Sequence, residues 1–433
     1  MTGTKGPLIG ARHLQTLLLY LTLVVNLISR HSIAVTLVAM TDAQTTNPNF
    51  PEFDWDEKQK SYILSSFFWG YIVSQIPGGY AARRFGVKVC TLIGTFGSAI
   101  LGLSVPFCVV WGGWQIFCAI RVLQGLCQGI IYPCVYQQIA MWSPVEERNL
   151  LGALTQTGVE SGTIVSMYVT GIIAASDLGW PGISYIFSGA GVPRKAEKYK
   201  SSMEGHTTSG PFISYLVVQT FDSWGFATMQ AQIPAYLHGV LKMEITKNAL
   251  YSALPYVATF VLAFTFMISA DVILKNKWVS LLVLRKIFST IAMWGSAAFL
   301  IGIGFLSETQ TALAITFLTL NVGLASASVI GSLLNLIDLS PNHSGILMGF
   351  TNTLLNVVPI LSPIVVGLIV NDATDRSQWQ IVFLISAGFY FLGNLQYLFF
   401  AQTDVQPWDS EDYMTKCDTE RGDKMTQAPV RDN

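Results

Sequence analysis

Four ionisable side chains stand inside long apolar stretches of this sequence: Arg30, Arg121, Glu160 and Asp222. A charge inside a membrane costs about 3 kcal/mol or more, so such residues are functional candidates. Two guanidinium groups that face one cavity would form a site for a carboxylate or a phosphate. A carboxylate can carry a proton. We therefore expect Arg30 and Arg121 to bind an anion, with Glu160, Asp222 and the neighbouring His31 as candidates for ion coupling.

Some of these residues also have a purely structural interpretation. Arg121 would be satisfied by a buried ion pair with Glu160, or by extending its long side chain to the outer interface. His31 follows Arg30 directly. A histidine in that place is more often a satisfied polar neighbour than a proton carrier.

The composition indicates a membrane protein. The chain has 433 residues, of which 51% are hydrophobic and 12% charged, and its mean hydropathy is +0.47. An average soluble domain has about 25% charged residues, so this chain cannot cover a soluble surface of its size. Its net charge of -1 leaves no basic surplus for nucleic acid. Phosphate-binding loops, nucleophile constellations, cofactor motifs and metal-ligand clusters are absent from the sequence. We expect neither an enzyme nor a bound cofactor.

The apolar stretches predict an all-α, polytopic protein in the lipid bilayer, because a span needs about 20 mostly apolar residues. About eleven full spans are predicted, at 14–40, 61–81, 88–109, 114–140, 150–175, 211–236, 248–270, 281–305, 311–333, 345–369 and 380–401. Between the fifth and the next lies only the apolar segment 180–192. A helix of that length reaches about 20 Å, against a hydrocarbon core of about 30 Å. The sixth span is therefore predicted to be truncated.

These spans divide the chain into two halves. Residues 1–192 form an N-terminal half of five spans and the short stub, 193–210 a cytosolic linker, 211–401 a C-terminal half, and 402–433 a polar tail, cytosolic and disordered. Lysine and arginine concentrate in alternate loops, whereas the loop after the first span is acidic. The positive-inside rule then places both termini in the cytosol.

Several motifs carry a family resemblance. They are Ser-Phe-Phe-Trp-Gly-Tyr at 66–71, Gln-Ile-Pro-Gly-Gly-Tyr at 75–80, Arg-x-x-Gln-Gly-x-x-x-Gly-x-x-x-Pro at 121–133, Ile-Asp-Leu-Ser-Pro-Asn at 337–342 and Gln-Pro-Trp at 406–408. Together they resemble the anion:cation symporter branch of the major facilitator superfamily, which includes sialin, the vesicular glutamate transporters and the sodium–phosphate cotransporters. The resemblance runs from about Arg30 to Trp408 and is strongest to insect inorganic phosphate cotransporters.

The resemblance implies the major facilitator fold and secondary active transport of an organic or inorganic anion by alternating access. Coupling would be to sodium, to protons or to the membrane potential, in the plasma membrane or in a vesicle or lysosome membrane. Arg30 and Arg121 match the family's arginines. Ser32 stands where the family usually has asparagine, which implies a changed selectivity. Gln128 stands where family members carry a glutamate, so Glu160 is a candidate to replace it in coupling.

Another set of residues is expected to have a gating or structural role. Glycines spaced by four form a face on which helix backbones approach closely. Prolines can kink membrane helices. Basic residues after the second span resemble the family's cytoplasmic gating loop, although simple positive-inside anchoring explains them equally well. The set is Gly79, Arg83, Arg84, Gly125, Gly129, Pro133, Glu147 and Arg148.

The truncated sixth span also supports a rival of another class. A non-transporting isoform would interact or compete with full-length transporters. Placing glycosylation sites after residue 200 discriminates the two, since luminal modification there would mean an inverted C-terminal half.

Overall fold

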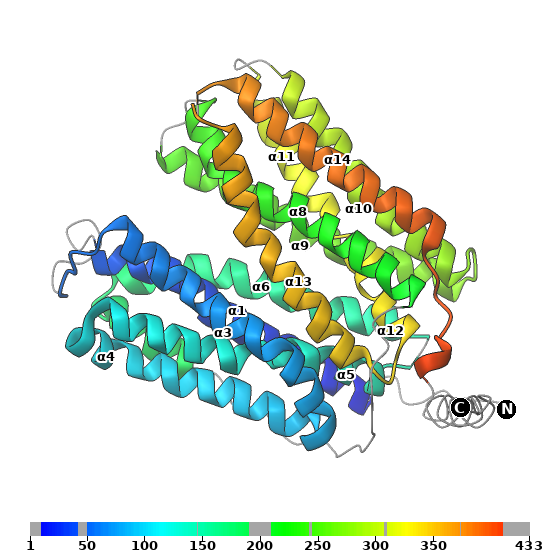
Figure 1. Ribbon diagram of the computed structural model, residues 1–433, viewed down its shortest axis with the longest axis horizontal. Helices are drawn as coiled ribbons and strands as arrows, with labels where there is room; N and C mark the ends of the chain where they lie inside the picture. The colour runs from blue at the N-terminus through cyan, green and yellow to red at the C-terminus, as the bar shows by residue number, and fades with distance from the viewer. Residues whose placement is uncertain are drawn as a thin grey trace, which may run out of the picture.

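The computed structural model describes residues 10–41, 50–144, 146–189, 209–241, 245–306, 310–372 and 374–409. Over these ranges the chain is almost entirely helical and contains no strand. The helices form two bundles that meet at one end and diverge toward the other (Figure 1). The prediction of an all-α fold is confirmed.

The N-terminal half consists of the helices up to the short α7. They are α1 (Ala11–Thr41), α3 (Glu57–Phe85), α4 (Val87–Gly129), α5 (Ile131–Trp142), α6 (Arg148–Ala175) and α7 (Gly179–Gly189). The element α4 is two helices in opposite directions, because Gly113 has the non-helical angles φ 61° and ψ -156°. This reversal lies between the predicted spans 88–109 and 114–140.

The C-terminal half begins at Gly210. Its elements are α8 (Gly210–Gly239), α9 (Ile245–Lys275), α10 (Leu281–Phe305), α11 (Thr311–Ala325), the π-helical turn η1 (Val329–Leu333), α12 (Asn335–Leu339), α13 (Ser344–Ile369), α14 (Arg376–Phe400) and the 3₁₀ turn η2 (Pro407–Asp409). The predicted span 311–333 is thus not one regular helix, since η1 interrupts it.

Side-chain caps fix where several helices begin. The Asp56 carboxylate accepts a hydrogen bond of 2.7 Å from the backbone N–H of Gln59, whose side chain in turn accepts one from the N–H of Asp56. This reciprocal pair is a capping box, and it starts α3. Asp375 caps α14, and its hydrogen bonds from Ser377 lower the pKa of the Asp375 carboxyl. The cap therefore stays ionised above that lowered pKa.

Seven helical stretches of the described chain are long and apolar enough to cross a membrane. They do not include α3, α6 or α8. Of these three, α6 carries Glu160 and α8 carries Asp222, so both contain an acidic residue that an ordinary lipid-facing helix lacks. Their lower hydropathy comes in part from polar side chains that are buried within the protein, among them Gln75 of α3, Gln156 of α6 and Gln219 of α8.

Glycines let α3 and α4 pack with their backbones in contact. A Cβ on Gly125 would lie 2.0 Å from the Phe67 carbonyl oxygen, and one on Gly129 would lie 2.5 Å from that of Tyr71. Neither carbonyl can move aside without moving its helix. The two glycines therefore occupy the close-contact face that their spacing predicts.

The structure describes a short helix, α7, at the place of the predicted truncated span. Its 11 residues rise about 16 Å, roughly half of a bilayer core. It packs on α1, α4 and α6, and Trp180 near its start is only 2% exposed. The Trp180 ring lies edge-on to Phe53, at 6.0 Å between centroids. The contact between Trp180 and Phe53 thus holds α7 against the segment that precedes α3. The predicted linker 193–210 falls almost wholly outside the described residues.

The two halves contact each other at one end, which we call the closed end. A Cβ on Gly79 of α3 would lie 2.7 Å from Ile346 Cα of α13, and one on Gly349 would lie 2.6 Å from the Gln75 carbonyl oxygen. The helices α1, α6, α8 and α13 start at this end, whereas α7 starts at the opposite, open end (Figure 1). The first helix of the C-terminal half, α8, therefore starts at the same end as α1, the first helix of the N-terminal half, so the C-terminal half is not inverted.

Candidate functional site

A cavity of about 350 Å³ lies between the two halves. Side chains of α1, α3, α5 and α6 form one wall, and side chains of α8, α9, η1 and α13 form the other. Its volume is within the range of small-molecule sites. The ionisable and amide residues of the wall are Arg30, His31, Tyr71, Tyr132, Glu160, Gln219, Asp222, Tyr256, Asn352 and Asn356.

Arg30 reaches this cavity from the middle of α1. Its guanidinium carbon lies 4.8 Å from the centroid of the Phe68 ring, 4.9 Å from that of Tyr71 and 5.2 Å from that of Phe67. Aromatic faces stabilise a guanidinium by cation–π attraction without using up its N–H donors. Those donors are left for an acid group in the cavity.

Arg121 is buried behind the wall rather than in it. The residue is 2% exposed, and its guanidinium carbon lies 4.7 Å from the Phe67 centroid. One guanidinium nitrogen donates a hydrogen bond of 3.1 Å to the Gln124 side chain, while its Nε has no partner. The structure thus brings both predicted arginines to one ring, Phe67. Only Arg30 lines the cavity in this conformation.

The three coupling candidates all line the cavity. Glu160 extends from α6, Asp222 from α8, and His31 follows Arg30 on α1. Within the described chain, Glu160 forms no ion pair with Arg121, so that structural alternative does not hold here. The Asp222 Oδ1 atom is buried and accepts no hydrogen bond. Carboxylates in such surroundings are candidates for taking up a proton or pairing with a cation.

Two other positions noted in the sequence lie away from the cavity. Ser32 is 6% exposed, and its hydroxyl donates to the Ser29 carbonyl oxygen at 3.4 Å. The Gln128 side chain donates to Ser98 Oγ at 2.7 Å, across the two arms of α4. Neither side chain is in the cavity wall. Gln128 thus serves packing within the N-terminal half, and direct substrate contact by Ser32 stays a prediction.

The C-terminal wall supplies residues that the sequence does not single out. Asn352 on α13 donates a hydrogen bond of 3.1 Å to the Tyr71 hydroxyl on α3, which joins the two halves across the cavity. Asn356 lies one turn further along α13, and its side chain donates to the Asn352 carbonyl at 2.6 Å. An asparagine every four residues within an apolar stretch is the signal that would have found them.

Among the predicted gating residues, Gly79 and Pro133 lie at the contact between the halves. The Pro133 carbonyl oxygen would lie 2.8 Å from a Cβ on Gly345, and Gly79 meets Ile346. Glu147 pairs instead with Arg12 of α1 within the N-terminal half.

The basic gating candidates have less direct roles. Arg84 is exposed at the end of α3, with its guanidinium carbon 5.6 Å from the Phe85 ring. Arg83, one residue earlier, and Arg148, at the start of α6, are both half-buried. Their gating roles stay predictions.

A buried ion pair lies at the closed end of the C-terminal half. The Arg285 Nε donates to Asp338 Oδ2 at 2.8 Å, and the two side chains are 0% and 5% exposed. Arg285 also donates to the Ile330 carbonyl oxygen in η1. The π-helical turn thus offers a backbone acceptor to a buried charge, and it places Val329 and Leu333 in the cavity wall.

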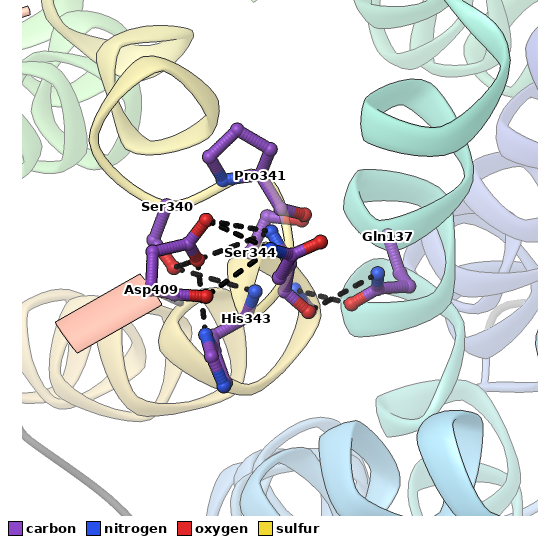
Figure 2. A network of polar contacts seen from close by, with 8 residues as sticks. Gln137, Ser340, Pro341, His343, Ser344 and Asp409 are labelled. Carbon is purple, nitrogen blue, oxygen red and sulfur yellow. Dashed lines mark hydrogen bonds and ion pairs between the residues drawn. The ribbon is translucent and has the colours of Figure 1, made fainter. Parts of the chain in front are cut away.

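The segment after α14 latches onto the same end (Figure 2). The Asp409 carboxylate accepts hydrogen bonds from Ser340 and from the Asn342 N–H and side chain, and it lies 2.9 Å from His343 Nδ1. Gln137 of α5 contacts the other side of this loop, donating to the Asn342 carbonyl at 3.4 Å. The prediction that the tail is disordered from residue 402 is wrong for residues 402–409, because Asp409 and its neighbours fold against this loop. Residues 410–433 lie outside the described chain.

We expect Asp409→Ala to lower the free energy of unfolding by roughly 2 kcal/mol or more, since it leaves several buried donors without an acceptor. Thermal unfolding of the purified protein measures this. Asp404→Ala is the matched control, because it removes the same charge from an exposed position in the same segment. Equal unfolding temperatures for the two variants would show that the Asp409 cluster does not hold the loop.

Comparisons with known proteins agree with this architecture. A family model described as "Major Facilitator Superfamily" matches residues 21–363. The chain is 32% identical over 397 residues to a "Putative inorganic phosphate cotransporter" of Drosophila ananassae, covering 83% of this chain and 82% of the relative. It is 29% identical over 439 residues to human sialin, covering 89% and 88%. Among solved structures, the E. coli fucose:proton symporter FucP superposes with a TM-score of 0.67 at 14% identity, covering 91% of this chain and all of that one.

Proposed function

This chain belongs to the Major Facilitator Superfamily, and from that premise we propose that it carries a small anion across a membrane by alternating access. The chain is an integral, multi-pass membrane transporter, and its relatives and fold are those of transporters rather than enzymes. The proposal concerns the solute class, phosphate or carboxylate, and the coupling ion. The observation that carries it is Arg30 in the wall of a cavity between two halves.

The geometry supports alternating access. The solute cavity lies between two bundles that contact each other through Gly79, Gly345 and Gly349 at one end. A transporter of this design rocks its halves about a central site so that each end closes in turn. We propose that the closed end faces the cytosol, since the basic residues Arg83 and Arg84 lie there. The described conformation is then the outward-facing state.

Arg30 is the residue that favours an anion. Its guanidinium is held on aromatic faces and has no ionic partner among the described residues. A planar donor fork of this kind pairs with carboxylate or phosphate oxygens in bidentate fashion. Arg121 supports the site from behind Phe67, where its buried Nε has no hydrogen-bond partner among the described residues.

The direct test is uptake into liposomes that contain the purified protein. Radiolabelled phosphate, gluconate, glutamate and a sialic acid would be offered with imposed sodium, proton or electrical gradients. We expect saturable uptake of at least one anion that requires one of the gradients. Absence of gradient-driven uptake for the whole panel, with protein shown to be folded, would contradict the proposal.

Proton coupling is proposed for Glu160. We expect Glu160→Gln to abolish the acceleration of uptake by an imposed proton gradient while leaving exchange of the anion without a gradient within about threefold, because an amide cannot carry a proton. Comparing the two assays on one preparation measures this. Glu147→Gln is the control, since Glu147 pairs with Arg12 outside the cavity. An unchanged gradient response in Glu160→Gln would assign coupling elsewhere.

A further inference from the structure

The charges in the cavity wall do not match a simple anion. The charged side chains in the wall are one arginine, Arg30, and two carboxylates, Glu160 and Asp222. None of them forms an ion pair within the described chain. A phosphate or plain carboxylate would pair with Arg30 but would offer no donor to Asp222, and either acid in its ionised form would repel it.

We infer that the carried solute is an organic acid that also bears a protonated amine, with its acid group bound at Arg30 and its amine at Asp222. The inference rests on the proposed function, because it narrows the solute class of the same cavity. It specifies an amphoteric solute rather than inorganic phosphate.

Asp222 supplies the acceptor for the amine. Its Oδ1 atom is buried and accepts no hydrogen bond. An unsatisfied, desolvated carboxylate oxygen is costly, and a donor from the solute removes that cost. An ammonium group offers three donors and no acceptor, so it complements a carboxylate in a way that an oxyanion does not.

The rest of the wall around Asp222 suits a cation with an apolar stem. On the C-terminal wall, which carries Asp222, the aromatic rings of Phe226 and Tyr256 line the same cavity. Aromatic faces attract an ammonium group by about 0.5–2 kcal/mol. On the opposite wall, Arg30 lies over the rings of Phe68 and Tyr71, which leaves its N–H donors for the acid group of the solute.

The two binding groups belong to different halves of the protein. Arg30 is on α1 of the N-terminal half and Asp222 is on α8 of the C-terminal half. A solute that pairs with both would draw the two halves together across the cavity. Glu160 then remains free of the solute, which is consistent with its proposed role in proton coupling.

Matched solute pairs test this inference on the full-length protein in liposomes. Each pair shares an acid group and differs by the amine: β-alanine and propionate, glutamate and glutarate, phosphoethanolamine and ethyl phosphate. The readout is protection of a Leu355→Cys variant from a maleimide, since Leu355 lines the cavity and is half-buried; the parent protein with its native cysteines gives the background. We expect at least one amine-bearing member to protect at a concentration at least 10-fold lower than its amine-free partner.

Variants then assign the preference to a residue. Asp222→Asn should remove the 10-fold difference within the pair, and Asp222→Glu should restore most of it. Asp271→Asn is the matched control, because it makes the same chemical change away from the cavity, where Asp271 pairs with Lys275 at the end of α9. Loss of the difference in Asp222→Asn but not in Asp271→Asn supports the inference.

Two contrary outcomes have different meanings. If the amine-free members protect equally or better, and this protection is lost in Arg30→Ala, the amphoteric class is overturned while anion transport stands. If no member of any pair protects, the inference fails; the proposed function fails with it only if phosphate, gluconate, glutamate and the sialic acid are not taken up either.

Discussion

Arg30→Ala is expected to lower the kcat/KM of solute uptake by about 100-fold or more. The reason is that Arg30 is the arginine of the cavity wall, and removing one partner of a desolvated charge pair costs about 2–5 kcal/mol. Arg30→Lys keeps the charge but loses the planar donor fork, so we expect an intermediate loss of about 10-fold, chiefly in KM. Initial rates of uptake into liposomes, over a range of solute concentrations, measure both.

A second arginine controls for protein quality. Arg376, at the start of α14, donates to the Gly304 carbonyl oxygen at 3.1 Å, remote from the cavity. Arg376→Ala should transport within about twofold of the parent. If Arg30→Ala retained more than a third of the parental kcat/KM, the cavity arginine would not be the anion-binding group, and Arg121 would become the next candidate.

Gly349→Ala is expected to shift the protein strongly away from the described conformation. The added Cβ would lie 2.6 Å from the Gln75 carbonyl oxygen, 3.2 Å from its carbon and 3.3 Å from Ile76 Cα, and all three are backbone atoms of the other half. Overpacking of this kind costs about 1–3 kcal/mol. The closed end should therefore open, by a population change of roughly 5- to 150-fold.

Gly367→Ala is its matched control on the same helix. A Cβ there would meet no atom within 4 Å. Both substitutions gain the same helix propensity, so the difference between them isolates the contact between the halves. The rate at which a maleimide added at the closed end modifies Met348→Cys reports the opening. Equal rates in the two glycine variants would mean that the glycine contact does not hold the gate shut.

The all-α membrane fold could be predicted from the sequence because length and hydropathy indicate whether a helix can cross a membrane. The number of spans and the truncation of the sixth stay predictions, since seven described stretches qualify as spans and the residues after Gly189 lie outside the described chain. Hydropathy does not show whether a side chain of a span lines the cavity or lies elsewhere in the protein. Arg30 and Arg121 have the same type and similar surroundings in the sequence, yet one lines the cavity and the other lies behind Phe67.

The features that the sequence does not reveal depend on tertiary contacts. The π-helical turn η1 forms where Gly331 packs closely against α10: a Cβ on Gly331 would lie 2.4 Å from the backbone N of Ser289. In the same turn, the Ile330 carbonyl oxygen accepts a hydrogen bond from Arg285. Asp409 looks like a polar tail residue until the loop at Ser340 folds against it. Such contacts join residues far apart in the chain, so no local pattern of residue types predicts them.

The glycine contacts at the closed end also have a kinetic consequence. Where Gly79 and Gly349 meet the opposite half, backbone touches backbone, and the Gln137 side chain adds hydrogen bonds with Asn342 and Gly345 across the same end. Dispersion attraction falls steeply within an ångström. A gate built in this way is expected to be cooperative, either fully closed or released, with few stable positions between. We therefore expect opening to break the glycine contacts and the Gln137 hydrogen bonds in one step.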